Sequence, residues 1–381
     1  MEISFARSDQ STLGVEWEVA LVDGTTGDLV PRGRETYEAV LAEHPEWAED
    51  GNHPHLTGEF LLNTVELVTG VCRDVAASTE QLSTMMDEIR RVADPRGLEI
   101  FAAGTHPFAR WQDQQVTDKQ RYHKLVDRTQ YWGRQMVIYG VHVHVGLDSR
   151  AKALPVLDGL LTYYPHLLAL SANSPYWAGE DTGYASHRSM IFQQLSTAGL
   201  PYQFGSWDEY ERCVADMIAT GIIEELSECR WDVRPVPRLG TNEVRFCDGL
   251  STLWEVGALT ALTQCLVHSL SADVEAGREP VRLQPWHVRE NKWRAARYGL
   301  EAQVITDSRN TERDLCEDLA LLLDRLEPVA ARLGCSRELS DVERIFRDGA
   351  GYQRQRAVAE AHGGELRAVA LDIVRRTREN A

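Results

Sequence analysis

The stretch Val15-Glu16-Trp17-Glu18-Val19 predicts a β-strand whose two faces differ in chemistry. Because successive side chains of a strand point to opposite faces, Glu16 and Glu18 share one face. Val15, Trp17 and Val19 share the other face. We therefore expect this strand to pack one face into a core and to present two carboxylates on the other.

Two later stretches repeat this division. In residues 141–145, His142 and His144 alternate with three valines, and in residues 242–246, Glu243 and Arg245 alternate with apolar side chains. Each stretch alone is compatible with a surface strand that has a solvated polar face. Solvated strands, however, usually carry Lys, Thr and Ser rather than Glu, His and Arg. If the three strands share one sheet, one face packs on helices and the other forms a cleft lined by Glu, His and Arg.

Two more acids, Glu59 and Glu66, lie in an otherwise apolar segment. Their separation is odd, so a bulge or bend is needed to bring both into one site. Clustered carboxylates repel and raise one another's pKa, and a divalent cation between them relieves this repulsion. Mostly carboxylate ligation favours Mg²⁺ or Mn²⁺ over zinc.

Several basic side chains are candidates for binding an anion. Arg234 and Arg238 flank Pro235 and Pro237 in a stiff loop before the Glu243 strand. Arginine binds phosphate and carboxylate with two parallel hydrogen bonds. A surface ion pair is the alternative for any single arginine, and we expect Arg234 and Arg245 to be the leading anion ligands. Further candidates are Arg188 and, at helical spacing, Asn291 and Arg294.

Composition narrows the class of protein. The 381 residues carry a formal net charge of -18, which disfavours a general nucleic-acid binder but not a nucleotide held through a metal. The seven cysteines form no Cys-x-x-Cys motif, as expected in a reducing compartment. The sequence has neither a signal peptide at its start nor an apolar run long enough to span a membrane, which predicts a cytoplasmic protein. P-loop, Rossmann, zincin and serine-hydrolase motifs are absent.

Apolar periodicity predicts an α+β fold with an antiparallel or mixed sheet. A catalytic domain is expected over residues 1–308, and three or four helices packed on it over residues 309–381. The expected strands are 13–23, one or two within 55–72, 98–105, 137–147, 230–234 and 241–247. The expected helices include 75–93, 119–136, 155–171, 207–219 and 253–274.

Several of these motifs also resemble a known family. Gly14-Val-Glu-Trp-Glu-Val-Ala-Leu-Val-Asp23, Gly140-Val-His-Val-His-Val-Gly146 and Gly240-Thr-Asn-Glu-Val-Arg245 are similar to segments of the YbdK-type carboxylate–amine ligases, the glutamate–cysteine ligase 2 family. The resemblance extends from about residue 10 to residue 305. It implies a glutamine-synthetase-like sheet whose concave face binds ATP and Mg²⁺ or Mn²⁺. It also implies amide formation through an acyl phosphate.

The resemblance assigns roles to the candidate residues. Amino acid and amine substrates are expected, without a nucleic-acid or membrane partner, and a homo-oligomer is compatible with the sequence. The metal ligands implied are Glu16, Glu18, Glu59, Glu66, His142 and Glu243. The implied catalytic residues are His144, Arg234 and Arg245. The implied nucleotide-binding residues are His144, Arg234, Arg238, Asn291 and Arg294. The implied substrate-binding residues are Thr105, His106 and Arg188.

Other functions fit part of the pattern. A metal-dependent amide hydrolase also uses His-x-His, although it usually recruits more His and Asp ligands. A phosphotransferase on the same fold and a non-catalytic binding protein are further alternatives. Metal-dependent ADP release that requires both an amino acid and an amine separates a ligase from all three.

Overall fold

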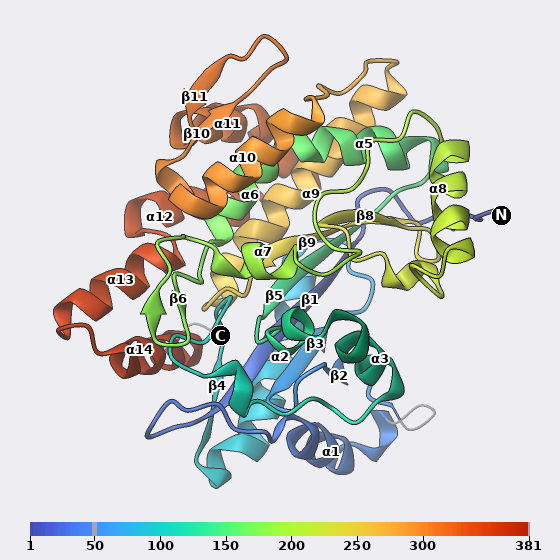
Figure 1. Cartoon of the computed structure of the whole chain (residues 1–381). Helices are drawn as coiled ribbons and strands as arrows, with labels where there is room; N and C mark the ends of the chain where they lie inside the picture. The colour runs from blue at the N-terminus through green and yellow to red at the C-terminus, as the bar shows by residue number, and fades with distance from the viewer. Residues whose placement is uncertain (48–51, 380–381) are drawn as a thin grey trace.

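The computed structural model describes residues 1–47 and 52–379, and it is organised around a seven-stranded sheet (Figure 1). The strand order is β2-β3-β1-β5-β9-β8, and β4 pairs with the far end of β1. All pairs are antiparallel, which confirms the predicted fold class. The strands are β1 (Leu13–Asp23), β2 (Leu56–Gly58), β3 (Thr64–Val68), β4 (Leu98–Phe101), β5 (Gly140–Gly146), β8 (Val233–Val236) and β9 (Thr241–Asp248).

The strand register aligns the chemical faces that the sequence predicted. On β1, Glu16 lies opposite His142 of β5, and Glu18 lies opposite Glu66 of β3. On the next strand, Glu243 of β9 lies opposite His144 of β5. Directly opposed residues on one face have neighbouring Cβ atoms, so the register alone brings these side chains together.

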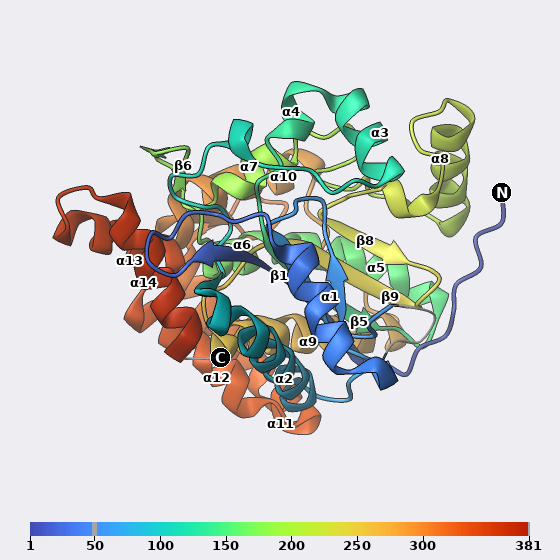
Figure 2. The ribbon, with the colours of Figure 1, turned by 90° about the horizontal axis from the view of Figure 1, so that it is seen from below.

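The apolar face of the sheet forms the main core. Val15, Trp17 and Val19 are at most 1% exposed. Two long helices cover this face, α2 (Val75–Ala93) and α9 (Leu253–Glu275) (Figure 2). Residues 255–267 of α9 are buried without interruption, because the sheet lies on one side of the helix and other helices lie on the rest.

Shorter helices cover the opposite, polar face of the sheet. Figure 2 shows α3 (Gln120–Thr129), α4 (Tyr131–Arg134) and the short α7 (His187–Phe192) on the far side of the sheet from α2 and α9. Only Tyr122 of α3 is fully buried. On this side, α3 therefore packs only loosely over the polar face of the sheet.

The remaining elements frame these two layers. The helices are α1 (Gly33–Glu43), α5 (Arg150–Thr162), α6 (Tyr164–Ser171), α8 (Trp207–Ala219), α10 (Pro285–Tyr298), α11 (Leu315–Leu333), α12 (Ser336–Asp348), α13 (Gly351–Ala361) and α14 (Leu366–Glu379). Two small hairpins pair β6 (Tyr176–Trp177) with β7 (Glu180–Asp181) and β10 (Gln303–Ile305) with β11 (Glu312–Asp314).

Four predicted elements differ from those observed. The helix predicted over 155–171 begins at Arg150 and is interrupted at Tyr163, just before Pro165 near the start of α6, where proline is tolerated. The helix predicted over 119–136 is interrupted at Gln130, whose φ of 48° is not helical. The strand predicted over 230–234 lies instead at Val233–Val236, and the one predicted over 98–105 ends at Phe101.

The C-terminal segment forms four helices, within the range predicted. One hydrophobic core joins residues on both sides of position 308, such as Val304, Leu319 and Val342. The division into two domains at that position stays a prediction. Within residues 1–47 and 52–379, no helix has the length and apolar content that crossing a membrane requires.

Candidate active site

The polar face of the sheet carries two clusters of potential metal ligands. Glu16, His142 and Glu243 form the first acidic set, and Glu18, Glu66 and His142 form the second acidic set. In each set, one ligand atom per residue lies within 4.8 Å of the others. Five of the six predicted metal ligands therefore converge, and His142 belongs to both sets.

In the first acidic set, basic groups surround both carboxylates. Glu16 Oε2 lies 2.8 Å from His142 Nδ1, and Glu16 Oε1 lies 3.3 Å from His144 Nε2. Glu243 accepts a hydrogen bond of 2.6 Å from Arg234 Nε and one from Arg245 Nη1. His144 Nε2 is 3.6 Å from Glu243 Oε1, so this imidazole lies between the two carboxylates.

These contacts outweigh the effect of burial on the carboxylates. Burial alone would raise the pKa of Glu16, but hydrogen bonds from His142 and His144 hold this pKa well below its ordinary value. Burial would likewise raise the pKa of Glu243, but Arg245, His144 and Arg234 lower it to about 2.

The pKa values of the two histidines are shifted in opposite directions. Burial and the nearby Arg245 lower the pKa of His142 to about 4, despite its contact with Glu16. Burial would lower the pKa of His144 too, but Glu243 and Glu16 raise it above its ordinary value. A neutral His142 is the form that binds metals, whereas a charged His144 suits an anion.

In the second acidic set, the carboxylates face one another. Glu18 lies opposite Glu66, and its Oε2 accepts a 2.5 Å hydrogen bond from the Gly140 backbone N–H. Burial raises the pKa of Glu18 to about 7. Burial, together with Glu59, Glu16 and Glu18, raises the pKa of Glu66 well above its ordinary value. Negative charge in this set therefore exceeds the nearby positive charge.

Glu59 lies beside the second acidic set but outside both sets. It stands in the connection between β2 and β3, and this bend resolves the odd spacing from Glu66. Burial raises its pKa, and the backbone N–H of Phe60 donates a 3.1 Å hydrogen bond to its Oε2. The sequence led us to expect repulsion among all the clustered acids. The structure corrects this expectation for Glu16 and Glu243, which basic side chains neutralise.

A β-bulge positions Arg245 at this site. Val141 pairs with Cys247 and Val143 pairs with Val244, so two residues of β9 lie opposite the single residue His142. A bulge bends its strand and reorients a side chain. Arg245 pairs with Glu243 in the first acidic set and also lines the cavity beside the second. Its Nε is buried and has no hydrogen-bond partner among the described residues, which makes this donor a candidate for binding an acceptor group.

Arg188 reaches the same place from α7. The Ser186 hydroxyl caps α7 and also donates a 2.8 Å hydrogen bond to the buried carboxylate of Asp248. Gly140 is required here, because a Cβ at this position would lie 2.1 Å from Arg188 Nη2. Arg188 is 2% exposed, and among the described residues its Nε and Nη1 have no hydrogen-bond partner. A buried guanidinium with free donors indicates a site for an anionic group.

A cavity of about 150 Å³ opens between these side chains. Its floor is charged and contains Glu18, Glu59, His142, Arg188, Arg230 and Arg245. Its walls are mostly apolar and come from four separate segments: Phe60, Leu61 and Thr64, Tyr122 and Leu125, Met136 and Ile138, and Phe192 and Leu195.

Five predicted site residues neither line this cavity nor form a hydrogen bond or ion pair with a member of an acidic set among the described residues. The Thr105 hydroxyl donates to the Tyr176 carbonyl, and both ring nitrogens of His106 are occupied by backbone groups. The Asn291 amide forms two 2.8 Å hydrogen bonds with the Ile305 backbone. Arg294 pairs with Glu290 and Glu312, and Arg238 is exposed in the turn between β8 and β9. The contacts of the first four residues stabilise the fold.

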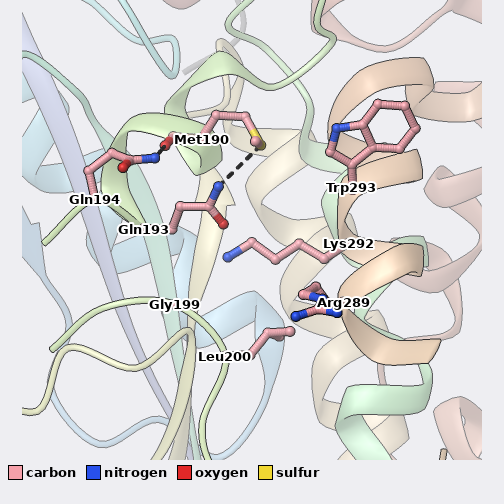
Figure 3. Close-up of a pocket in the computed structure, with 8 residues that line it drawn as sticks. All are labelled: Met190, Gln193, Gln194, Gly199, Leu200, Arg289, Lys292 and Trp293. Atoms are coloured by element: carbon pink, nitrogen blue, oxygen red, sulfur yellow. Dashed lines mark hydrogen bonds between the residues drawn. The ribbon is translucent and has the colours of Figure 1, made fainter. Parts of the chain in front are cut away.

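Another cavity lies between α7 and α10 (Figure 3). Lys292 points into it from α10, facing Gln193 and Met190 of the α7 segment. The Lys292 Nζ lies 2.7 Å from Asp232 Oδ2, so its charge is already paired. None of the residues that line this cavity belongs to either acidic set. The acidic face is therefore the stronger candidate for a catalytic site.

Sequence reasoning missed two parts of the site. Arg230 lines the cavity floor, and its even spacing from Arg234 could have identified it as a residue of the same face. The apolar wall had no sequence signal, because its residues come from distant segments and each one is typical of an ordinary core.

Comparison with known proteins identifies the family. The model of the glutamate–cysteine ligase family 2 matches residues 12–372. A protein of Arthrobacter sp. (strain FB24) with the provisional name glutamate–cysteine ligase 2-1 is 62% identical over 99% of both chains. A protein of Leifsonia xyli subsp. xyli, with the provisional name glutamate–cysteine ligase 2, is 55% identical over 99% of this chain and 98% of its own.

Solved structures share the fold at low sequence identity. The glutamate–cysteine ligase of Francisella tularensis, solved with AMP, has a TM-score of 0.68 at 15% identity and covers 98% of this chain and 90% of its own. The bifunctional glutathione synthetase of Pasteurella multocida has the same TM-score and identity over 97% of this chain and 52% of its own. Together with the family match, which the resemblance of the motifs predicted, these findings show that the chain belongs to glutamate–cysteine ligase family 2, a family of carboxylate–amine ligases.

Proposed function

We propose that the protein joins a carboxylate to an amine in an ATP-dependent reaction that passes through an acyl phosphate. The observation that carries the proposal is the division of one sheet face into carboxylates with raised pKa and buried arginines with free donors. The carboxylates can hold divalent cations, and the arginines can hold the transferring phosphoryl group and a substrate carboxylate. Family membership supports the reaction class.

The donor atoms of this face fit Mg²⁺ or Mn²⁺. Each acidic set offers two carboxylates and one imidazole, and oxygen-rich ligation is what these hard cations prefer. Burial is the main cause of the raised pKa of Glu18 and Glu66, and a bound cation would lower both pKa values. Glu16, Glu243 and His142 would hold one ion, and Glu18, Glu66 and His142 another, with Glu59 beside them. A bound ion would neutralise charge on the phosphate oxygens.

In the first step, an oxygen of the substrate carboxylate attacks the γ-phosphorus of ATP, and the bond to the departing ADP breaks. Arg245 can stabilise charge on the phosphoryl group through its free Nε, and its buried pairing with Glu243 keeps it charged. His144, held between Glu16 and Glu243, is a second cation at this position. Arg234 orients Glu243, because two of its nitrogens are already bonded to Glu243 and to backbone carbonyls.

In the second step, the amine nitrogen forms a bond to the carbonyl carbon of the acyl phosphate. The bond between this carbon and the phosphate oxygen breaks, a proton passes from the nitrogen to the departing phosphate, and amide and hydrogen phosphate are released. Arg188, with two free donors beside the cavity, is placed to orient a substrate carboxylate.

The family match favours a ligase over a metal-dependent hydrolase or a phosphotransferase. The content of the site agrees, because its companions to the His-x-His strand are Glu and Arg rather than the additional His and Asp typical of hydrolases.

Isotope transfer tests the proposal. With ¹⁸O in the substrate carboxylate, one labelled oxygen should appear in the released phosphate for each amide formed, and omission of Mg²⁺ should abolish both products. Amide formation with unlabelled phosphate would exclude the acyl phosphate. ADP release that needs no amine would exclude the ligase.

A further inference from the structure

Most of the apolar wall of the cavity belongs to a small hydrophobic cluster that is separate from the main core. Met136, Ile191 and Leu195 are its buried members, and the half-buried side chains packed against them include Phe60, Leu125, Ile138 and Phe192. All of these side chains except Ile191 line the cavity. Apolar surface left facing a cavity is stabilised when an apolar ligand group covers it.

The wall offers few hydrogen-bond partners to a polar side chain. Of its nine residues, only Thr64 and Tyr122 carry a polar group. The Thr64 hydroxyl already donates a 2.9 Å hydrogen bond to Asn63 Oδ1, and the Tyr122 hydroxyl accepts a 2.6 Å hydrogen bond from Arg121. A charged or amide side chain placed here would lose its hydration without gaining hydrogen bonds. The wall therefore selects against polar substituents.

The charged floor of the cavity provides a second binding feature for the ligand. Arg188 faces this cavity with two free donors, while the wall lies on α3 and around α7. A ligand that uses both features has a carboxylate and, attached to the same small skeleton, an apolar side chain. An apolar α-amino acid has this composition.

The size of the cavity restricts the occupant further. About 150 Å³ is less than the roughly 300–1,000 Å³ of pockets that enclose drug-sized ligands, so the cavity itself holds only a small group. The cavity nevertheless has room for several non-hydrogen atoms, whereas the side chain of cysteine has only two beyond its Cα.

We propose that the amine substrate is an α-amino acid with an aliphatic side chain larger than that of cysteine. Its side chain contacts the wall of Leu125, Ile138 and Leu195, and its carboxylate binds Arg188. This inference rests on the proposed ligase function and specifies the amine that this site accepts.

An amine series tests the assignment in the full-length enzyme with ATP, Mg²⁺ and glutamate. We expect kcat/KM to rise from L-2-aminobutyrate to L-norvaline to L-leucine, by about fourfold for each added methylene. L-cysteine should rank with 2-aminobutyrate, and L-aspartate should be the poorest. 3-Methylbutylamine, which is leucine without its carboxylate, should be at least tenfold poorer than leucine. A flat series, or a preference for cysteine or aspartate, would overturn the proposal.

A matched pair of variants connects the preference to the wall. Leu125→Ala removes a wall side chain, whereas Val126→Ala truncates the next residue of the same helix, which is also half-buried but does not line the cavity. The leucine to 2-aminobutyrate ratio of kcat/KM should fall at least threefold in Leu125→Ala and stay within twofold in Val126→Ala. Equal changes in both would refute a direct contact with Leu125.

A binding measurement separates this inference from the ligase function. Calorimetric titration of 2-aminobutyrate, norvaline and leucine into the protein with Mg²⁺ and a non-hydrolysable ATP analogue needs no turnover. Tighter binding along the series, without amide formation, would preserve the apolar site and refute the ligase. Amide formation without this trend, or leucine that competes with the ATP analogue, would overturn the inference and preserve the ligase.

Discussion

The two acidic sets share His142 and one sheet face, yet they differ in how their negative charge is balanced. In the first, arginine and histidine hold the pKa values of Glu16 and Glu243 below the ordinary range. In the second, burial and neighbouring acids raise the pKa values of Glu18 and Glu66. Basic side chains therefore balance the negative charge of the first set, whereas the negative charge of the second set is balanced only when a cation binds. We therefore expect metal binding to stabilise the second acidic set more than the first.

Removal of Glu243 should have the largest effect on stability. Glu243→Ala leaves Arg234, Arg245 and His144 buried without their common partner, and breaking a buried ion pair in this way costs about 3–5 kcal/mol. Urea unfolding in the presence of EDTA measures this loss. Glu66→Gln removes a charge from the second set and should leave the metal-free stability unchanged or higher. Equal losses in both variants would show that the two sets do not differ.

The second expected effect is stabilisation by metal. Binding to the native state alone adds about 2.7 kcal/mol at a concentration of 100 times the dissociation constant. Glu66→Gln should reduce the gain from Mg²⁺ well below that of the wild type, because it removes a ligand of the second set. Glu80→Gln on the exposed surface of α2 is the control and should respond as the wild type does. Thermal melts over a Mg²⁺ titration distinguish the three, and a full gain in Glu66→Gln would place the metal elsewhere.

A smaller effect should appear in the pH dependence of the metal-free protein. The pKa of Glu18 is about 7 in the folded state, above its unfolded value, so the folded state binds more protons between these values. Stability should therefore fall as the pH rises from about 5 to 7.5, by on the order of 1 kcal/mol for this partly exposed group. Glu18→Gln should flatten this slope in denaturation curves recorded with EDTA, and excess Mg²⁺ should flatten it in the wild type. A slope that survives both changes belongs to other groups.

The smallest effect concerns a residue outside both sets. Arg294 pairs with Glu290 and Glu312 at the surface, and such ion pairs contribute about 0–1 kcal/mol. Arg294→Ala should change the unfolding free energy by less than about 1 kcal/mol. It should change the KM for ATP by less than about twofold, which corresponds to less than half a kcal/mol. Steady-state kinetics at saturating amino acid and amine measure this KM, and a large increase would return Arg294 to the nucleotide site that the sequence predicted.

The sequence predicted the antiparallel sheet and the residues of its polar face, because a strand's alternation depends only on neighbouring positions. It could not predict how charge is distributed over that face. Glu16 and Glu18 look equivalent in the sequence, but the register sets one opposite His142 and the other opposite Glu66. The assignments of Thr105, His106 and Asn291 failed to converge on the site for a related reason, since a buried polar residue serves the fold as often as a ligand.

The burial of α9 also affects how the protein is made. Its middle is covered by the sheet and by α2, which precede it in the chain, and by α11 and α12, which follow it. On the ribosome, α9 emerges before α11 and α12 exist, so a nascent chain exposes a long apolar helix until synthesis is nearly finished. Premature termination anywhere before α12 should therefore yield a product that aggregates or engages chaperones, instead of a smaller working enzyme.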